Sequence, residues 1–237
     1  MAKPLDQPSR PLPKADYRWI WTPTDGAAAP WFRVYHRTAH VPDGVTFRTF
    51  GPLNRFDHHT PPVTAKAIDP DGRSVSYFGV NLATAACEVF GEAGVAPVCP
   101  GFRVTLVRPV REIVTYDLAQ PNAAMAIGAV PALASGNENR ELTQQWAQAI
   151  YEDQPTATKV EGIRYRTAYR DDYSIVLWDC PDAVEVAMDA KGQPLDIPLN
   201  EGRGRKLLLK ALAGTGIPVT FPAADDCTRC SPAGSAT

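Results

Sequence analysis

Short segments in which apolar and polar residues alternate recur along this chain, and a period of two residues predicts β-strands. Strands are expected over residues 31–37, 74–80, 102–107, 112–116, 163–169, 174–178 and 183–188. The segment 46–62 is interrupted by Gly51, Pro52, Pro61 and Pro62. It therefore predicts an irregular region around one short strand.

Other segments follow a helical pattern. Asn81 is placed to cap a helix that begins at residue 82, because its side chain can accept hydrogen bonds from the free amides of the first turn. Helices are also expected in the alanine-rich stretch 122–133, over 139–151, where apolar residues recur at spacing four, and over 205–213. Strands and helices do not alternate regularly, so the expected fold class is α+β, a single domain with a mixed β core and surrounding helices.

Proline content divides the chain into parts. Residues 1–30 form a proline-rich N-terminal arm that cannot be one long helix, and its aromatic residues Tyr17, Trp19 and Trp21 are expected to pin it to the main body. Residues 31–215 form the main domain. Residues 216–237, with three prolines and the ending SPAGSAT, predict a flexible C-terminal tail.

Charge and hydropathy narrow the possible partners. The 237 residues include 24 basic and 26 acidic side chains, a net charge of −2, so there is no overall field for nucleic acid or an anionic membrane, and direct binding to either is not expected. No apolar run approaches the roughly 18 residues of a membrane span, and the start lacks the layout of a signal peptide. These features predict a cytoplasmic protein.

The five cysteines suggest no metal centre. Cys87, Cys99 and Cys180 lie in apolar contexts and are interpreted as small buried side chains. Cys227 and Cys230 form a CxxC pair, but a zinc site needs a second pair of ligands. The nearest candidates for that second pair, His58 and His59, are adjacent in sequence, so they lack the spacing of a ligand pair and have no partner cysteine. A mobile CxxC tail without metal is therefore the favoured interpretation.

Common catalytic motifs are missing from the sequence. The run EGRGRK at 201–206 lacks the spacing of a phosphate-binding loop, and no GxSxG, HExxH or GxGxxG follows a strand. Cys87 beside Glu88 raises the possibility of a thiol nucleophile, but a cysteine on an alanine-rich helix is better explained as core packing. Any function must therefore be inferred from a less familiar sequence pattern.

Four segments in order, FRVYHR, FGPLNRF, SVSYFGVNLATAACEVFGE and EGIRYRTAYRDDYSIVLW, resemble the RES-domain family, named for an arginine, a glutamate and a serine. The resemblance covers about residues 31–178. The family arginines match Arg33 and Arg55, and the third segment supplies Tyr77 and Glu88. Thr167 stands where the family has serine, which keeps the hydroxyl and adds a methyl group.

The resemblance implies a fold related to ADP-ribosyltransferase toxins and an activity on NAD as substrate. The reaction would be cleavage of the nicotinamide–ribose bond by water or phosphate, in a glycohydrolase or phosphorylase, or transfer of ADP-ribose to a target. Family members are usually toxins of toxin–antitoxin systems, so a helix-turn-helix antitoxin is the implied protein partner. No metal is required, because nicotinamide leaves as a neutral molecule.

Chemistry suggests a role for each matching residue. The catalytic set is Glu88, whose carboxylate would stabilise an oxocarbenium-like transition state, with Arg33 and Thr167. Arginine forks suit a diphosphate, so Arg33 and Arg55 are predicted to bind NAD. Tyr77 or Tyr35 would provide an aromatic wall for nicotinamide. The Thr167 hydroxyl would orient Glu88 or the ribose.

Two alternatives remain open from the sequence. An ADP-ribosyltransferase acting on a protein or nucleic acid would use the same NAD-binding residues with a different acceptor. A non-catalytic interaction module would instead use the aromatic arm and a basic patch formed by Arg203, Arg205 and Lys206. Ser174 is an alternative to Thr167, ranked lower because it begins the next expected strand.

Overall fold

The chain folds into two compact units, each with its own hydrophobic core. A computed structural model of the protein describes residues 4–23, 30–135 and 139–230. Unit 1 comprises residues 1–28, 47–77 and 109–183, and unit 2 comprises residues 29–46, 78–108 and 184–237. β5 (Val75–Gly79) passes along the chain from unit 1 into unit 2.

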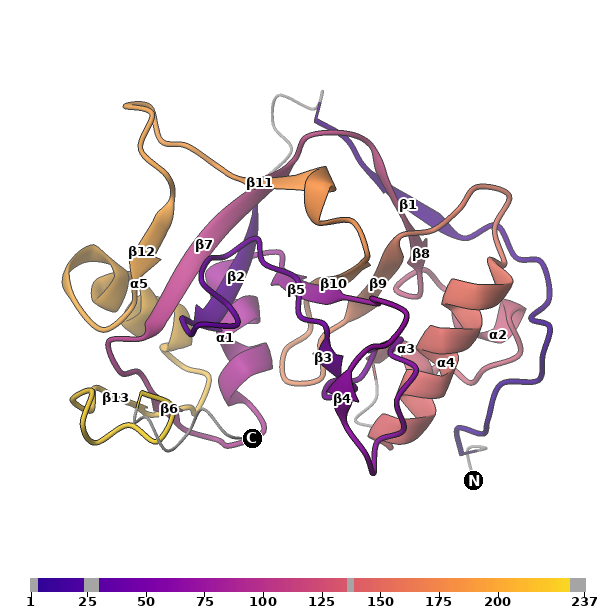
Figure 1. Cartoon of the computed structure of the whole chain (residues 1–237), viewed down its shortest axis with the longest axis horizontal. Helices are drawn as coiled ribbons and strands as arrows, with labels where there is room; N and C mark the ends of the chain where they lie inside the picture. The colour runs from indigo at the N-terminus through magenta and orange to yellow at the C-terminus, as the bar shows by residue number, and fades with distance from the viewer. Residues whose placement is uncertain (1–3, 24–29, 136–138, 231–237) are drawn as a thin grey trace. The chain divides into compact units, whose positions relative to one another are not determined.

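Unit 1 is built on a mixed sheet (Figure 1). Its strands follow the order β1 (Arg18–Trp21), β8 (Ile113–Asp117), β9 (Gly162–Arg166) and β10 (Tyr173–Trp178). β8 and β9 are parallel, whereas the pairs β1–β8 and β9–β10 are antiparallel. A parallel pair needs a long crossover, and here the crossover contains the three α-helices that the structure describes in this unit. The predicted α+β class with a mixed sheet is confirmed.

The crossover of unit 1 contains α2 (Ala123–Ala126), α3 (Ala132–Ser135) and α4 (Arg140–Asp153). The helix predicted over 139–151 is confirmed, and its apolar face buries Trp146 and Ile150 in the core. A helix spanning 122–133 is wrong, because Gly128, at φ +90°, and Pro131 separate α2 from α3. The short strand expected within 46–62 is β3 (Phe50–Gly51), which pairs with β4 (Ala67–Ile68).

The N-terminal arm contributes to the core of unit 1. Leu5 and Leu12 are buried in it, and β1 pairs with β8 along all four of its residues. Arg10 forms ion pairs with Glu152 and Asp153 at the end of α4. The arm is thus joined to unit 1 by a strand pair, buried leucines and ion pairs, and Trp21 is buried as well.

Unit 2 is centred on β7 (Phe102–Pro109). β2 (Trp31–His36) and β12 (Asp196–Pro198) both pair with β7 antiparallel, and β11 (Val184–Val186) follows β7 in the strand order. The helices are α1 (Leu82–Phe90) and α5 (Gly202–Leu212). Two short strands, β6 (Ala96–Pro97) and β13 (Val219–Thr220), pair in parallel. A 3-10 turn, η1 (Pro181–Ala183), closes unit 1 before β11.

Asp179 joins two parts of unit 1 and makes its stability sensitive to acid. It accepts hydrogen bonds from the Ser74 amide, at 2.5 Å, and from His58 Nε2, at 3.1 Å. Burial opposes ionisation of Asp179, but hydrogen bonds from His58 and the Ser74 amide outweigh it and lower the pKa of the carboxyl to about 2. The unfolded chain titrates near about 3.9. Asp179 therefore stabilises the fold above about pH 4, and this contribution disappears as pH falls towards about 2.

We expect Asp179→Asn to flatten this acid dependence. Asparagine tolerates the left-handed backbone at this position, where φ is +51°, and cannot titrate. Urea midpoints measured between about pH 4 and pH 2 should fall less steeply in the variant than in the parent protein. Equal slopes would show that another carboxylate controls the acid response.

No helix among the described residues has both the length and the apolar character needed to cross a membrane.

Candidate functional site

Arg33 and Tyr35 project from one face of β2 in unit 2, two residues apart. Arg33 Nη1 donates to the Thr46 carbonyl at 2.6 Å and to the Gly44 carbonyl at 3.1 Å, and its guanidinium carbon lies 5.6 Å from the centre of the Tyr35 ring. The Tyr35 hydroxyl donates to Asp196 at 2.9 Å. Both predicted NAD-binding side chains are thus oriented by contacts within unit 2.

Glu88 lies on α1, which packs against the opposite face of β2 through Val34 and Ala85. The predicted Asn81 cap is confirmed, since its side chain accepts a hydrogen bond from the Thr84 amide at 2.8 Å. Gly79 allows the close approach of the helix, because a Cβ there would lie 2.6 Å from the Ala85 nitrogen. Glu88 is half-buried. The strand, cap and small residues therefore hold one carboxylate at a fixed place on a short helix.

Tyr77 is tied to a buried carboxylate in unit 1. Its hydroxyl donates to Asp57 at 2.6 Å, and Arg48 Nη2 lies 2.7 Å from the same carboxylate. Burial opposes ionisation of Asp57, but the Arg48 charge and hydrogen bonds from the Leu53 amide and Tyr77 outweigh it, so the pKa of Asp57 is lowered. Burial, with the charge of Asp57 beside it, raises the pKa of Tyr77 well above its usual value. Tyr77 therefore stays a neutral donor, and its side chain is half-buried against the core of unit 1.

Arg55 lies near this group in unit 1. Its guanidinium carbon is 4.9 Å from the centre of the Phe56 ring and 5.4 Å from that of Tyr165. Nη2 donates weakly to the Leu133 carbonyl, at 3.3 Å. Nε and Nη1 are buried and have no hydrogen-bond partner within residues 4–23, 30–135 and 139–230. Arg55 is therefore a cation held against aromatic rings. Its Nε and Nη1 donors are directed at no acceptor in the described part of the protein.

Thr167 follows β9 at the start of a hairpin turn. Its hydroxyl donates to the Arg170 carbonyl, and its amide donates to the Asp172 carbonyl at 3.0 Å. The side chain is buried and serves the turn in this structure. Ser174, the alternative from the sequence, is also buried, and its Oγ has no partner among the described residues. The structure thus leaves both hydroxyls as candidates.

The family model that matches the chain is that of the RES domain, over residues 30–200. The chain belongs to the RES domain family. The resemblance predicted from the four sequence segments is confirmed, and the match includes Arg33, Tyr35, Arg55, Tyr77, Glu88 and Thr167.

Among solved structures, the RES chain is similar to one chain of the crystal structure of the M. tuberculosis MbcT–MbcA toxin–antitoxin complex. The two share 15% sequence identity, the alignment covers 82% of this chain and 92% of that chain, and the TM-score is 0.49. No curated protein matches this chain in sequence.

No sequence signal pointed to two residues that contact the candidate residue Tyr77 or its partner, Arg48 and Asp57. Together they position Tyr77, and Asp57 is completely buried. An aspartate in a loop of prolines and histidines carries no specific signal, because such residues are usually solvated. Asp57 could have been recognised as a structural carboxylate only once its burial was known.

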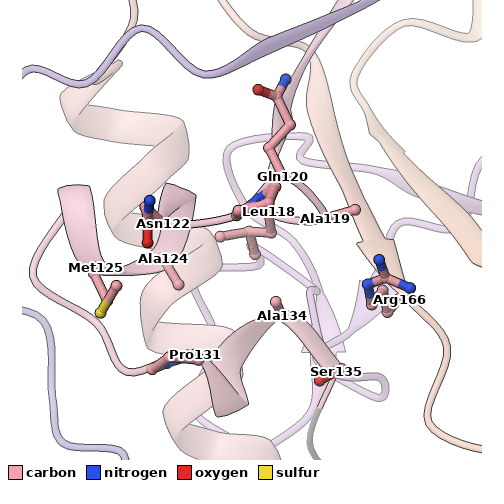
Figure 2. Close-up of a pocket in the computed structure, with 11 residues that line it drawn as sticks. Leu118, Ala119, Gln120, Asn122, Ala124, Met125, Pro131, Ala134, Ser135 and Arg166 are labelled. Carbon is pink, nitrogen blue, oxygen red and sulfur yellow. The ribbon is translucent and has the colours of Figure 1, made fainter.

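The RES domain also has a pocket of about 230 Å³ in unit 1 (Figure 2). Leu118 and Met125 line one side, Ala134 and Ser135 come from α3, and Arg166 comes from the end of β9. Arg55, Tyr77 and Thr167 do not line it, although Arg166 directly precedes Thr167. This pocket is therefore distinct from the group formed by Arg55 and the aromatic rings of Phe56 and Tyr165.

Proposed function

We propose that this RES protein is a cytoplasmic toxin of a toxin–antitoxin system that cleaves the nicotinamide–ribose bond of NAD. The observation that carries the proposal is Arg55, whose guanidinium lies against the packed rings of Phe56 and Tyr165 with two buried donors unused within the described residues. Leaving buried donors without acceptors is unfavourable, so such a site favours an anionic ligand. The diphosphate of a dinucleotide supplies planar pairs of acceptor oxygens that fit this fork.

Glu88 is the proposed catalytic carboxylate. When the bond between nicotinamide and C1 of the ribose breaks, nicotinamide leaves with the electron pair as a neutral molecule and positive charge develops on the sugar. A fixed carboxylate stabilises that charge only as it forms, which is the condition for lowering the barrier. Water or phosphate then attacks C1, and the proton lost by water passes to solvent.

The remaining matching residues have supporting roles in this proposal. Arg33 would contact the diphosphate, and Tyr35 or Tyr77 would lie against the nicotinamide ring. Tyr77 suits this role because Asp57 fixes its hydroxyl while the side chain is only partly buried. The hydroxyl of Thr167, or of Ser174, would orient the ribose.

An enzyme that consumes NAD must be restrained in the cell that makes it. We therefore propose an antitoxin partner that occludes the site, and the resemblance implies that it is a helix-turn-helix protein. The MbcT–MbcA structure is a complex of a toxin with an antitoxin, which is consistent with this arrangement.

The deciding experiment incubates the purified protein with NAD, with and without phosphate, and follows free nicotinamide and ADP-ribose products. Nicotinamide release with ADP-ribose indicates a glycohydrolase, and phosphate-dependent release indicates a phosphorylase. Release only when a protein or nucleic-acid acceptor becomes labelled would assign ADP-ribosyl transfer instead. If no nicotinamide forms under any of these conditions, the proposal is wrong.

We expect Arg55→Met to raise the KM for NAD by about 10- to 100-fold, because a hydrogen bond to a charged group contributes about 1.5–3 kcal/mol. Methionine keeps a long apolar stem against Phe56 and Tyr165, so the fold should persist. The matched control is Arg108→Met, which removes an exposed arginine whose ion pair with Glu185 lies at the surface. If the two variants had equal KM values for NAD, Arg55 would not be part of the NAD site.

A further inference from the structure

Four metal-ligand side chains from distant parts of the sequence meet in unit 2. His36 Nε2 lies 3.2 Å from Cys99 Sγ and 3.4 Å from Cys230 Sγ, and the two sulfurs are 3.3 Å apart. Cys227 completes the group, and its ligand atom lies within 4.8 Å of each of the other three. None of the five cysteines of the chain forms a disulfide.

These separations fit a tetrahedral ion. Zinc binds thiolate sulfur at about 2.3 Å and imidazole nitrogen at about 2.0 Å, so around one tetrahedral ion two sulfurs lie about 3.8 Å apart and a sulfur and a nitrogen about 3.5 Å apart. Three thiolates and one imidazole are a donor set that selects zinc over magnesium or calcium, which prefer oxygen ligands. The distances between His36 Nε2, Cys99 Sγ and Cys230 Sγ are about 0.1 to 0.5 Å shorter than this. Small outward shifts of these side chains, with a small shift of Cys227, would bring all four atoms to a tetrahedral arrangement.

The backbone holds the ligands from three elements. His36 is the last residue of β2, and Cys99 follows β6 by two residues. The CxxC follows β13, which pairs with β6 through a 2.9 Å hydrogen bond from the Ala96 amide to the Pro218 carbonyl. This pairing carries the C-terminal segment past Cys99, so that the convergence is a consequence of the fold.

The residues around the four ligands leave room for the imidazole and add a positive charge beside the sulfurs. Gly101 leaves space for the imidazole, because a Cβ there would lie 2.4 Å from His36 Nε2. Arg229, stacked 5.5 Å from the Phe102 ring, places a cation on the same turn. Zinc with three thiolates and a neutral imidazole has a net charge of about −1, which this cation complements.

We propose that His36, Cys99, Cys227 and Cys230 form a structural Zn²⁺ site that fastens the C-terminal segment to the β6–β7 turn of unit 2. All four positions are filled by protein ligands, so no position remains for a substrate. Cys227 and Cys230 lie beyond residue 200, where the RES match ends, so the site is an addition to the matched domain. Cys180 provides a contrast, since it is buried and belongs to no such group of ligand side chains among the described residues.

The test measures metal in the full chain purified under reducing conditions without added zinc. We expect one zinc per chain by native mass spectrometry, and thiolate-to-metal charge-transfer bands when Co²⁺ replaces it. Cys227→Ser with Cys230→Ser should lose the metal, whereas Cys180→Ala should retain it. A chelator should lower the Tm of the parent and of Cys180→Ala but leave that of the double variant unchanged.

Gly101→Ala provides a second variant that removes no ligand atom. By displacing the His36 ring it should weaken zinc binding by about 10- to 100-fold while the CxxC stays intact. The proposal is overturned if the parent carries no zinc and gives no cobalt–thiolate bands, if the metal is iron in a cluster, if oxidised Cys99 and Cys230 form a disulfide instead, or if the double variant keeps its zinc. None of these readouts depends on NAD turnover, so failure here leaves the proposed function standing.

Discussion

Replacing Glu88 by glutamine should lower the rate of nicotinamide release from NAD by about 100-fold or more, because one electrostatic group of this kind contributes about 3 kcal/mol to transition-state stabilisation. Glutamine is nearly isosteric and an equally good helix former, so α1 and its packing against Val34 should survive. The KM for NAD should change little, since the charge is needed mainly as the bond breaks. Steady-state nicotinamide release measures both constants.

The control for this substitution is Glu92→Gln, the same change at an exposed position just beyond α1. It should leave turnover unchanged. A folded Glu88→Gln variant that released nicotinamide at the parent rate would exclude Glu88 as the catalytic carboxylate, even if the family assignment stands.

Asp57→Asn should destabilise the protein by about 3 kcal/mol, the largest effect on stability that we expect. Removing one partner of a buried ion pair leaves the other charge uncompensated, which typically costs about 3–5 kcal/mol, and the partial exposure of Arg48 reduces the loss. The Tyr77 hydroxyl and the Asn54 amide donate to different oxygens of Asp57, so the NH₂ group of asparagine also replaces the acceptor of one of them. Urea unfolding followed by tryptophan fluorescence measures the change.

Asp71→Asn is the matched control, because Asp71 is exposed, and it should stay within about 0.5 kcal/mol of the parent protein. If Asp57→Asn were equally mild, the buried carboxylate would not be holding Arg48 and Tyr77 together. Because Tyr77 depends on Asp57 for its position, the variant should also show a raised KM for NAD under conditions in which it is fully folded.

Local patterns predicted local structure well. The Asn81 cap and the helix behind it are confirmed because a cap, small residues and apolar spacing act within a few residues of one another. The strand at 31–36 follows from simple alternation. β1 was interpreted only as an extended arm, since its pairing with β8, about a hundred residues away, leaves no mark on its own sequence.

The same contrast between local and long-range signals applies to the candidate site. The order of segments was enough to identify the family and to select Arg55, whose aromatic contacts depend on Tyr165 from β9. The hydrogen bonding of Thr167 within its own turn was not predictable, because it depends on the path of the hairpin. The convergence of His36 with Cys99, Cys227 and Cys230 was not predictable either, because it depends on the pairing of β6 with β13.

The position of β1 has a consequence for how the protein is handled. The RES match begins at residue 30, yet β1 covers the outer edge of β8, a strand whose five residues are all buried. A chain shortened to the matched domain would expose a row of unpaired amides and carbonyls on an apolar strand. Such an edge is a template for pairing with other chains. Trimming to the family boundary would therefore produce aggregation, and the arm acts as a built-in guard against self-association.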